Sequence, residues 1–171
     1  MNRKGTVYFF TGLSGAGKTT IGSLFHKRLK EKEENVIFLD GDLTRPVFCE
    51  DLGYTEEERL KVAFRVFRVC KMLSDQGMDV VCCSICMFEA VRAWNREHID
   101  NYKEIYLQVK WETLVQRNQK GLYTAGKNVV GLDIPFDEPK HSDVVVKNDG
   151  QQTPLEIVEQ LEETFFKKQS K

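Results

Sequence analysis

A glycine-rich stretch near the amino terminus has the residue types and spacing of a phosphate-binding loop. In FFTGLSGAGKTT, Gly12 and Gly17 are separated by four residues, and Lys18 and Thr19 follow directly. Glycines permit backbone conformations in which successive N–H groups converge on phosphate oxygens, and the dipole of a following helix adds to the attraction. We expect the lysine to reach the β- and γ-phosphates of ATP and the threonine hydroxyl to bind Mg²⁺. A glycine-rich turn without a ligand is the alternative, but the flanking strand and helix patterns favour the nucleotide site.

Two carboxylates, Asp40 and Asp42, end the second apolar run in FLDGD. At the edge where ligands bind in open α/β sheets, one carboxylate can help to hold Mg²⁺ through water, and the other can orient or deprotonate an acceptor hydroxyl. An ordinary Asp-Gly turn is the alternative. Beside a phosphate loop, the pair favours phosphoryl transfer over hydrolysis for switching. The predicted nucleotide-binding residues are Gly12, Ser14, Gly15, Ala16, Gly17, Lys18, Thr19 and Thr20, and the predicted magnesium ligands are Thr19 and Asp40.

Five cysteines include the cluster CCSIC, in which Cys83 and Cys86 have C-x-x-C spacing. A metal or redox site is one interpretation, but no second pair of cysteines or spaced histidines completes a zinc site. Free cysteines are commonly buried and behave as small apolar side chains. We therefore expect these cysteines to fill the core around a strand.

The elements that must position these residues alternate between apolar runs and amphipathic helical patterns. The predicted strands are 6–11, 35–40, 78–85, 102–109 and 142–149, and the predicted helices are 18–32, 55–77, 88–100, 111–119 and 153–168. Thr55 with Glu58 is a capping-box signal at the start of the second helix. The alternation predicts an α/β fold, a parallel sheet of about five strands flanked by helices, of the P-loop NTPase type. Segment 120–141 shows no sustained period and is rich in Gly and Pro, which favours a mobile lid.

Length and charge limit the classes of function. The chain has 171 residues, enough for one domain over 1–171, and its net charge of −1 gives no sign of a nucleic-acid or membrane partner. No secretory signal or membrane-spanning run is evident, so we expect a cytoplasmic protein.

Several motifs together resemble those of the adenylylsulfate kinase family. They are GLSGAGKTT, LDGD followed by Arg45, EDLGYTEEERLKVAFRV, QKGLY and GLDIPFDEP, in one order from about residue 7 to 148. The resemblance implies transfer of the γ-phosphate of ATP to the 3′-hydroxyl of adenosine 5′-phosphosulfate with Mg²⁺, a lidded P-loop kinase fold and a homodimer. It also implies a catalytic role for Asp42, acceptor-facing roles for Arg45 and Arg65, and places for Arg117 and Lys120 beside the phosphates.

The departures from the family pattern lie mostly on the acceptor side. Val62 and Phe64 stand in VAFR where the family has N-I-R-R, and Cys86 replaces a serine that can carry phosphate in some members. VVGLD, with Val129 and Val130, replaces F-T-G-I-D and removes a phenylalanine whose ring can stack on the acceptor's adenine. The predicted acceptor-side residues are Asp42, Arg45, Phe64, Arg65, Ile85, Cys86, Arg92, Lys120, Val129 and Val130.

These departures indicate the same reaction on a different small nucleotide, and cytidine diphosphoramidate in capsule or surface-polysaccharide biosynthesis is the favoured acceptor. A true adenylylsulfate kinase is the first alternative. A nucleotide-gated binding module without transfer activity is the second.

Overall fold

The computed structural model describes residues 3–118 and 121–166. Five parallel strands form one sheet in the order β2-β3-β1-β4-β5. Their bounds are β1 Val7–Thr11, β2 Val36–Asp40, β3 Asp79–Cys83, β4 Tyr102–Gln108 and β5 Val144–Lys147. The helices are α1 Lys18–Lys30, α2 Gly41–Phe48, α3 Glu56–Asp75, α4 Glu89–His98, α5 Trp111–Arg117, α6 Leu122–Ala125 and α7 Pro154–Phe166.

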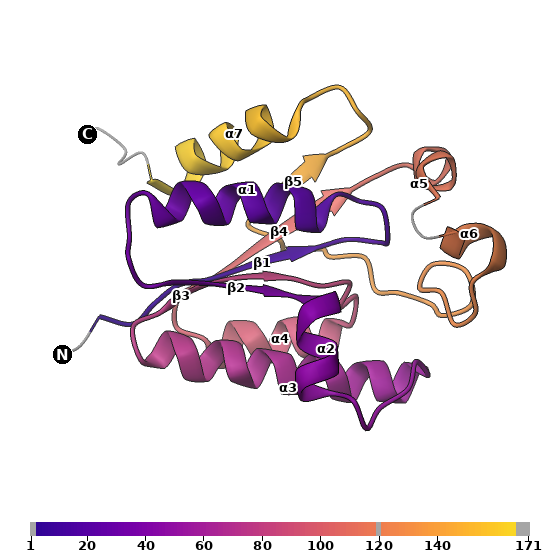
Figure 1. Cartoon of the computed structure of the whole chain (residues 1–171), viewed down its shortest axis with the longest axis horizontal. Coiled ribbons are helices and arrows are strands. Elements are labelled where there is room, and N and C mark those ends of the chain that lie inside the picture. The colour runs from indigo at the N-terminus through magenta and orange to yellow at the C-terminus, as the bar shows by residue number, and fades with distance from the viewer. Residues whose placement is uncertain (1–2, 119–120, 167–171) are drawn as a thin grey trace.

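The sheet lies between two layers of helices. Helices α1 and α7 cover one face, and α3 and α4 cover the other (Figure 1). Every residue of β1 and β3 is buried, as expected for central parallel strands that are covered on both faces. The five predicted strands and the α/β fold are therefore confirmed.

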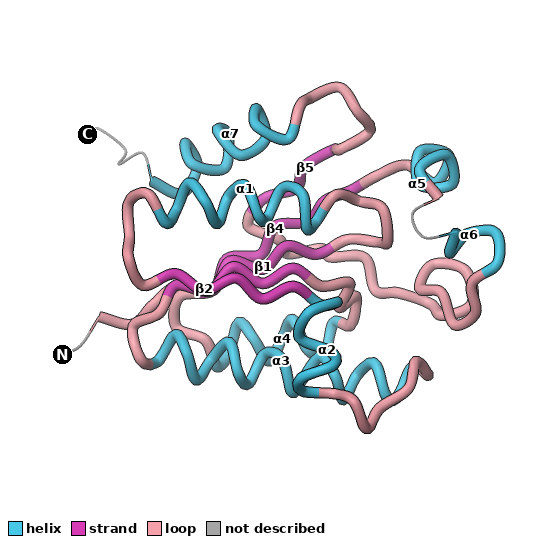
Figure 2. The backbone as a smooth tube through the Cα atoms, in the orientation of Figure 1, coloured by secondary structure: helices cyan, strands magenta, loops and turns pink. Residues whose placement is uncertain are grey.

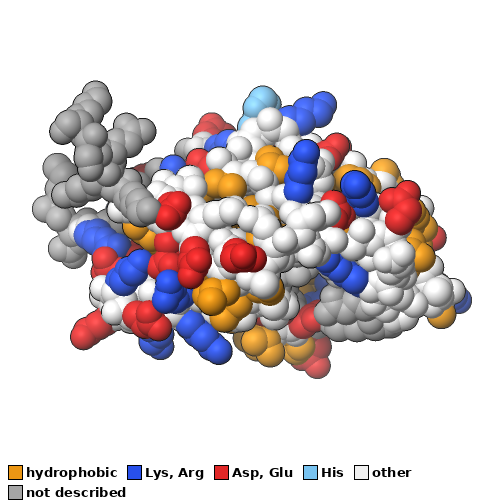
Figure 3. Space-filling view, turned by 90° about the horizontal axis from the view of Figure 1, so that it is seen from above, with side chains coloured by type: hydrophobic (Ala, Val, Ile, Leu, Met, Phe, Trp, Pro, Cys, Tyr) orange, Lys and Arg blue, Asp and Glu red, His pale blue; other side chains and the backbone are white. Residues whose placement is uncertain are grey.

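Close packing of α1 on the sheet depends on a glycine. A Cβ atom at Gly22 would lie 2.2 Å from the Sγ atom of Cys83, so a larger residue would push α1 away from β3. All five cysteines are free and buried, which confirms that they act as core side chains. On the outer side, Arg28 and Lys32 of the α1 region contact Glu162 of α7. On the face shown in Figure 3, acidic and basic side chains are intermixed.

One local prediction is confirmed, and the structure contains two short helices that the sequence pattern did not predict. Thr55 and Glu58 form the predicted capping box at the start of α3. No element was predicted directly after β2, and the structure forms α2 there (Figure 2), where the Asp40 carboxylate caps the helix by accepting the N–H of Asp42. Segment 121–141 contains the short helix α6 and a bridge between Val130 and Ile134, which its irregular pattern did not predict.

Within the described part of the chain, no helix is long and apolar enough to cross a bilayer.

Candidate active site

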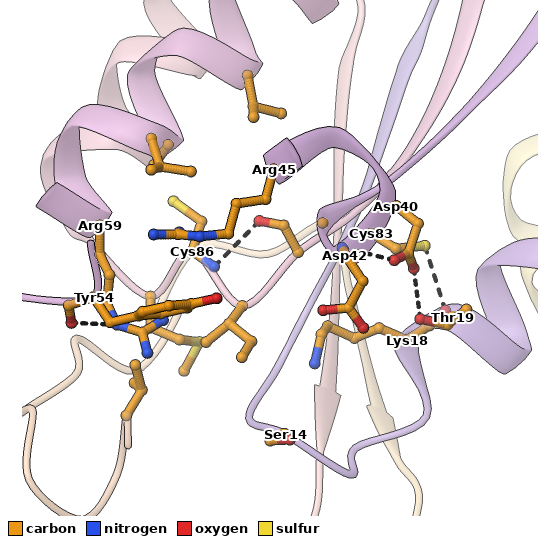
Figure 4. Close-up of a pocket in the computed structure, with 18 of the residues that line it drawn as sticks. Ser14, Lys18, Thr19, Asp40, Asp42, Arg45, Tyr54, Arg59, Cys83 and Cys86 are labelled. Atoms are coloured by element: carbon orange, nitrogen blue, oxygen red, sulfur yellow. Dashed lines mark hydrogen bonds between the residues drawn. The ribbon is translucent and has the colours of Figure 1, made fainter. Parts of the chain in front are cut away.

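A cleft of about 500 Å³ lies at the carboxyl edge of the sheet. The phosphate loop, the start of α2 and the first half of α3 supply part of its walls. The segment after β3 and residues 122–135 supply the rest. Strands of a parallel sheet all end at the same edge, so residues that are distant in the sequence meet there (Figure 4).

The phosphate loop adopts left-handed backbone conformations at its glycines. Gly15 and Gly17 have φ angles of 80° and 96°, which residues other than glycine rarely adopt. Lys18 is the first residue of α1, and its Nζ atom donates to the carbonyl oxygen of Leu13 at 2.8 Å. The ammonium group is thus folded back along the loop, and Figure 4 shows it pointing into the cleft.

Asp40 connects the phosphate loop to α2. Its Oδ2 atom accepts a 2.6 Å hydrogen bond from the hydroxyl of Thr19, and its Oδ1 atom accepts the backbone N–H of Asp42 at 2.9 Å. The side chain is buried, so both oxygens are held in place. Asp42 lies in the first turn of α2, and Figure 4 shows its carboxylate directed into the cleft near Lys18.

The oxygen donors at this point fit a magnesium ion. Mg²⁺ is usually bound by one or two carboxylates, water and substrate phosphates. Thr19 and Asp40 supply a hydroxyl and a buried carboxylate in direct contact. Among the described residues, no cluster of three or more His, Cys, Asp or Glu side chains could hold a metal alone. The fit is therefore to a magnesium ion shared with a nucleotide.

The chain resembles known kinases along most of its length. Residues 4–147 match the family model for adenylylsulphate kinase. The chain belongs to the adenylylsulfate kinase family. It is 42% identical to the cytidine diphosphoramidate kinase of Campylobacter jejuni over 147 residues, which cover 83% of this chain and 85% of that protein. It is 34% identical to the adenylyl-sulfate kinase of Halothermothrix orenii over 173 residues, which cover 96% of this chain and 94% of that protein.

A solved structure agrees with this membership. The Mycobacterium tuberculosis APS kinase CysC, in complex with AMPPNP and APS, superposes with a TM-score of 0.86 at 28% identity. The match covers 94% of this chain and 97% of that one. This chain is thus an adenylylsulfate kinase-like phosphotransferase with a P-loop kinase fold, as its motifs predicted.

Two arginines of this kinase share one aromatic ring in the cleft. The guanidinium carbon of Arg45 lies 4.0 Å from the ring centroid of Tyr54, and that of Arg59 lies 5.2 Å from it. Partial burial, followed by the nearby positive charge of Arg45, lowers the pKa of Arg59. Two like charges held close together in a cleft are suited to an anion, which would relieve their repulsion.

Apolar side chains form the rest of the acceptor side. Val62, Ala63 and Val66 of α3 line the cleft on one side, and Val129 and Val130 line it on the other. Ile85 and Cys86 also line the cleft. Burial raises the pKa of the Cys86 thiol to about 12, so this thiol is neutral at physiological pH.

Arg117 lies against the phosphate loop. Its Nη1 atom donates to the carbonyl oxygen of Gly15 at 3.0 Å, and its Nη2 atom donates to that of Asn148 at 2.8 Å. The lid also contacts this loop, because the hydroxyl of Tyr123 donates to the carbonyl oxygen of Ser14 at 2.5 Å. Lys120 lies outside the described residues.

Three other predicted acceptor residues lie elsewhere in the structure. Phe64 packs edge-to-face against Trp94, with 6.1 Å between the ring centroids. Arg65 forms an exposed bidentate ion pair with Asp51 at 2.5 and 2.8 Å. Arg92 is fully buried and donates to Glu89 at 2.7 Å. Their structural contacts point to packing roles rather than to direct contact with an acceptor in this conformation.

Sequence reasoning missed several residues that line the cleft. Tyr54 and Arg59 lie within DLGYTEEER, which supported the family resemblance, yet neither was assigned a role. Lys127 of the lid also lines the cleft. Helical spacing was the available signal for Arg59, because Val62, Ala63 and Val66 follow it at three, four and seven residues and lie on the same helix face.

Proposed function

We propose that this kinase transfers the γ-phosphate of ATP to the ribose 3′-hydroxyl of cytidine diphosphoramidate. One observation carries the proposal: the chain keeps the family's residues around the phosphate loop, but its acceptor-side residues differ from the family pattern. Lys18 of the phosphate loop and the contact between Thr19 and Asp40 support the ATP side of this proposal. The relative with 42% identity is named for the proposed acceptor.

The residues of the chain support direct, in-line transfer. Asp42 accepts the proton of the acceptor's 3′-hydroxyl while the hydroxyl oxygen forms a bond to the γ-phosphorus. The bond between that phosphorus and the β–γ bridging oxygen breaks, and ADP is released. Lys18 and Arg117 stabilise the charge on the phosphates during this step. Thr19 and Asp40 would hold a magnesium ion, which would neutralise part of the phosphate charge.

The acceptor site combines charge with a small apolar wall. Arg45 and Arg59 are placed to bind the anionic diphosphate-like part of the acceptor. The ring of Tyr54 in the same cleft contacts these two guanidinium groups, and Val129 and Val130 stand where the family has an adenine-stacking ring. Base–aromatic stacking contributes about 1–3 kcal/mol, so the loss of one ring disfavours the larger purine base.

A competition between acceptors tests this assignment. Turnover divided by the Michaelis constant is measured for cytidine diphosphoramidate and for adenylylsulfate at one concentration of ATP and Mg²⁺. We expect the cytidine compound to be preferred. Adenylylsulfate is the second candidate, because the matched mycobacterial structure holds APS. A preference for adenylylsulfate of about tenfold, or roughly 1.4 kcal/mol, would overturn the cytidine assignment.

We also propose that the kinase works as a cytoplasmic homodimer in capsule or surface-polysaccharide biosynthesis. Leu43 and Val47, one turn apart on α2, are 68% and 72% exposed, and a second copy would cover such a pair. The mass in solution, measured by light scattering, tests the dimer. A monomer at all protein concentrations examined would contradict it.

A further inference from the structure

We infer that Asn148 is a positioning residue for ATP, because its side chain fixes the orientation of a peptide group in the phosphate loop. The inference rests on ATP binding at this loop, as proposed above, and does not depend on which acceptor is used. Asn148 lies directly after β5, the edge strand next to β4, whereas α3 covers the face of the sheet opposite α1 and α7.

Three hydrogen bonds tie Asn148 to separate parts of the site. Its backbone N–H donates to the carbonyl oxygen of Gln108 at 2.9 Å and extends the pairing of β4 with β5. Its Nδ2 atom donates to the carbonyl oxygen of Ala16 at 2.9 Å. Its own carbonyl oxygen accepts the Nη2 atom of Arg117 at 2.8 Å. The rigid sheet is thereby connected to the loop and to the cation beside it.

The bond to Ala16 determines where the next N–H points. In a planar trans peptide, the C=O and N–H bonds point in opposite directions. With the carbonyl of Ala16 directed at Asn148, the N–H of Gly17 is directed away from Asn148. Gly17 lines the cleft, so this N–H is turned toward the space that the phosphates of ATP would occupy.

Close packing reinforces this orientation. A Cβ atom built on Gly17 would lie only 2.7 Å from the Nδ2 atom of Asn148, so the amide group sits directly against the loop. Gly17 also has a φ angle of 96°, a conformation that few other residues would maintain. The side chain of Asn148 thus supports the loop at a glycine, where the backbone is otherwise easiest to rotate.

Arg117 makes the role of Asn148 twofold. The guanidinium group of Arg117 donates to the carbonyl oxygens of Gly15 and Asn148, so both the phosphate loop and the end of β5 fix its position. Asp149, the next residue, accepts the backbone N–H of Lys110 at 2.8 Å and fixes the chain at the start of α5. The end of β5 therefore positions the helix that carries Arg117 as well as the loop that faces the phosphates.

Substitution of Asn148 tests the inference. Asn148→Ala removes the donor, and Asn148→Asp keeps the shape but places carboxylate oxygens toward the carbonyl of Ala16. Asn101→Ala is the matched control, because the Nδ2 atom of Asn101 also donates to a backbone carbonyl oxygen, that of Lys4 at 3.3 Å, near the amino-terminal edge of the sheet. Binding of a non-hydrolysable ATP analogue with Mg²⁺ is measured by calorimetry, together with the Michaelis constants for ATP and the acceptor and the melting temperature.

We expect Asn148→Ala to weaken analogue binding by about three- to tenfold, the range for one lost hydrogen bond, and Asn148→Asp to weaken it more. The Michaelis constant for ATP should rise in parallel, that for the acceptor should stay the same, and Asn101→Ala should change neither. Unchanged analogue binding in both folded Asn148 variants would overturn the inference. An equal rise in both Michaelis constants would also overturn it. A wrong acceptor would leave the calorimetric result intact, so the two failures can be told apart.

Discussion

Replacement of Asp40 separates the two tasks that its carboxylate performs. One oxygen accepts the N–H of Asp42 and caps α2, and the other accepts the hydroxyl of Thr19 where magnesium is proposed to bind. Asp40→Asn keeps an oxygen for the cap and removes the negative charge. Asp40→Ala removes both functions.

The contacts give the expected magnitudes. Loss of a helix cap costs about 1 kcal/mol, and loss of a hydrogen bond to a charged group costs about 1.5–3 kcal/mol. Asp40→Ala should therefore lower the free energy of unfolding by roughly 2–4 kcal/mol, which is about 5–15 °C in melting temperature for a chain of this size. Asp40→Asn should cost about 1 kcal/mol or less, because the cap and the packing remain.

Asp40→Asn should change the magnesium dependence of the kinase much more than it changes the stability. For Asp40→Asn, we expect the Mg²⁺ concentration that gives half-maximal kinase activity to rise about tenfold, the equivalent of roughly 1.4 kcal/mol of lost binding. Thr153→Ala is the control, because the Thr153 hydroxyl accepts the N–H of Glu156 at the start of α7, far from the cleft. That variant should lose stability and keep the wild-type magnesium curve. If Asp40→Asn also kept that curve, the assignment of Asp40 to the metal would be wrong.

Three further predictions concern the reacting groups. Lys18→Ala should abolish phosphoryl transfer in a folded protein, because an ammonium group near the phosphates contributes several kcal/mol, and wild-type turnover would contradict its role. Asp42→Asn should lower turnover by about 10²–10⁴ while ATP binding changes little, so a variant with only a raised Michaelis constant for ATP would argue against proton acceptance. Cys86 should carry no phosphate during turnover and should resist iodoacetamide at pH 8, because burial raises the pKa of its thiol to about 12; mass spectrometry checks both statements.

The strand and helix pattern predicted the framework well because apolar periodicity records burial directly. The central strands β1 and β3 are buried throughout and mainly apolar, with Thr11 and Asp79 as polar residues at their ends. Helix α2 was missed because it has only eight residues, begins at a glycine and contains Pro46. An Asp-Gly pair is more typical of a turn, and only the capping bond from Asp40 to the backbone shows that a helix starts there.

The acceptor side was harder to predict because the resemblance assigns residues without regard to the helix face on which they lie. Arg65 is two residues after Ala63, about 200° around the helix, so it points away when Ala63 faces the cleft. Arg59 precedes Ala63 by four residues and shares its face. The phosphate loop posed no such difficulty, since its chemistry depends on adjacent backbone groups whose order the sequence determines.

Arg59 provides the last prediction, because it touches the acceptor side and the lid at once. Its Nη2 atom donates to the lid carbonyl of Asn128 at 2.8 Å, and its guanidinium group lies over Tyr54. Loss of a charge-assisted contact of about 1.5–3 kcal/mol predicts a rise of roughly 10- to 150-fold in the acceptor's Michaelis constant for Arg59→Ala, with little change for ATP. Arg68→Ala is the matched control, because Arg68 also lies on α3 over a ring, that of Phe64 at 5.9 Å, but it is exposed and the ring packs on Trp94. Steady-state kinetics with each substrate varied would decide the matter. Equal effects of the two substitutions would show that α3 acts through general packing, and a rise confined to Arg59→Ala would place the anionic part of the acceptor at the Arg45–Tyr54–Arg59 cluster.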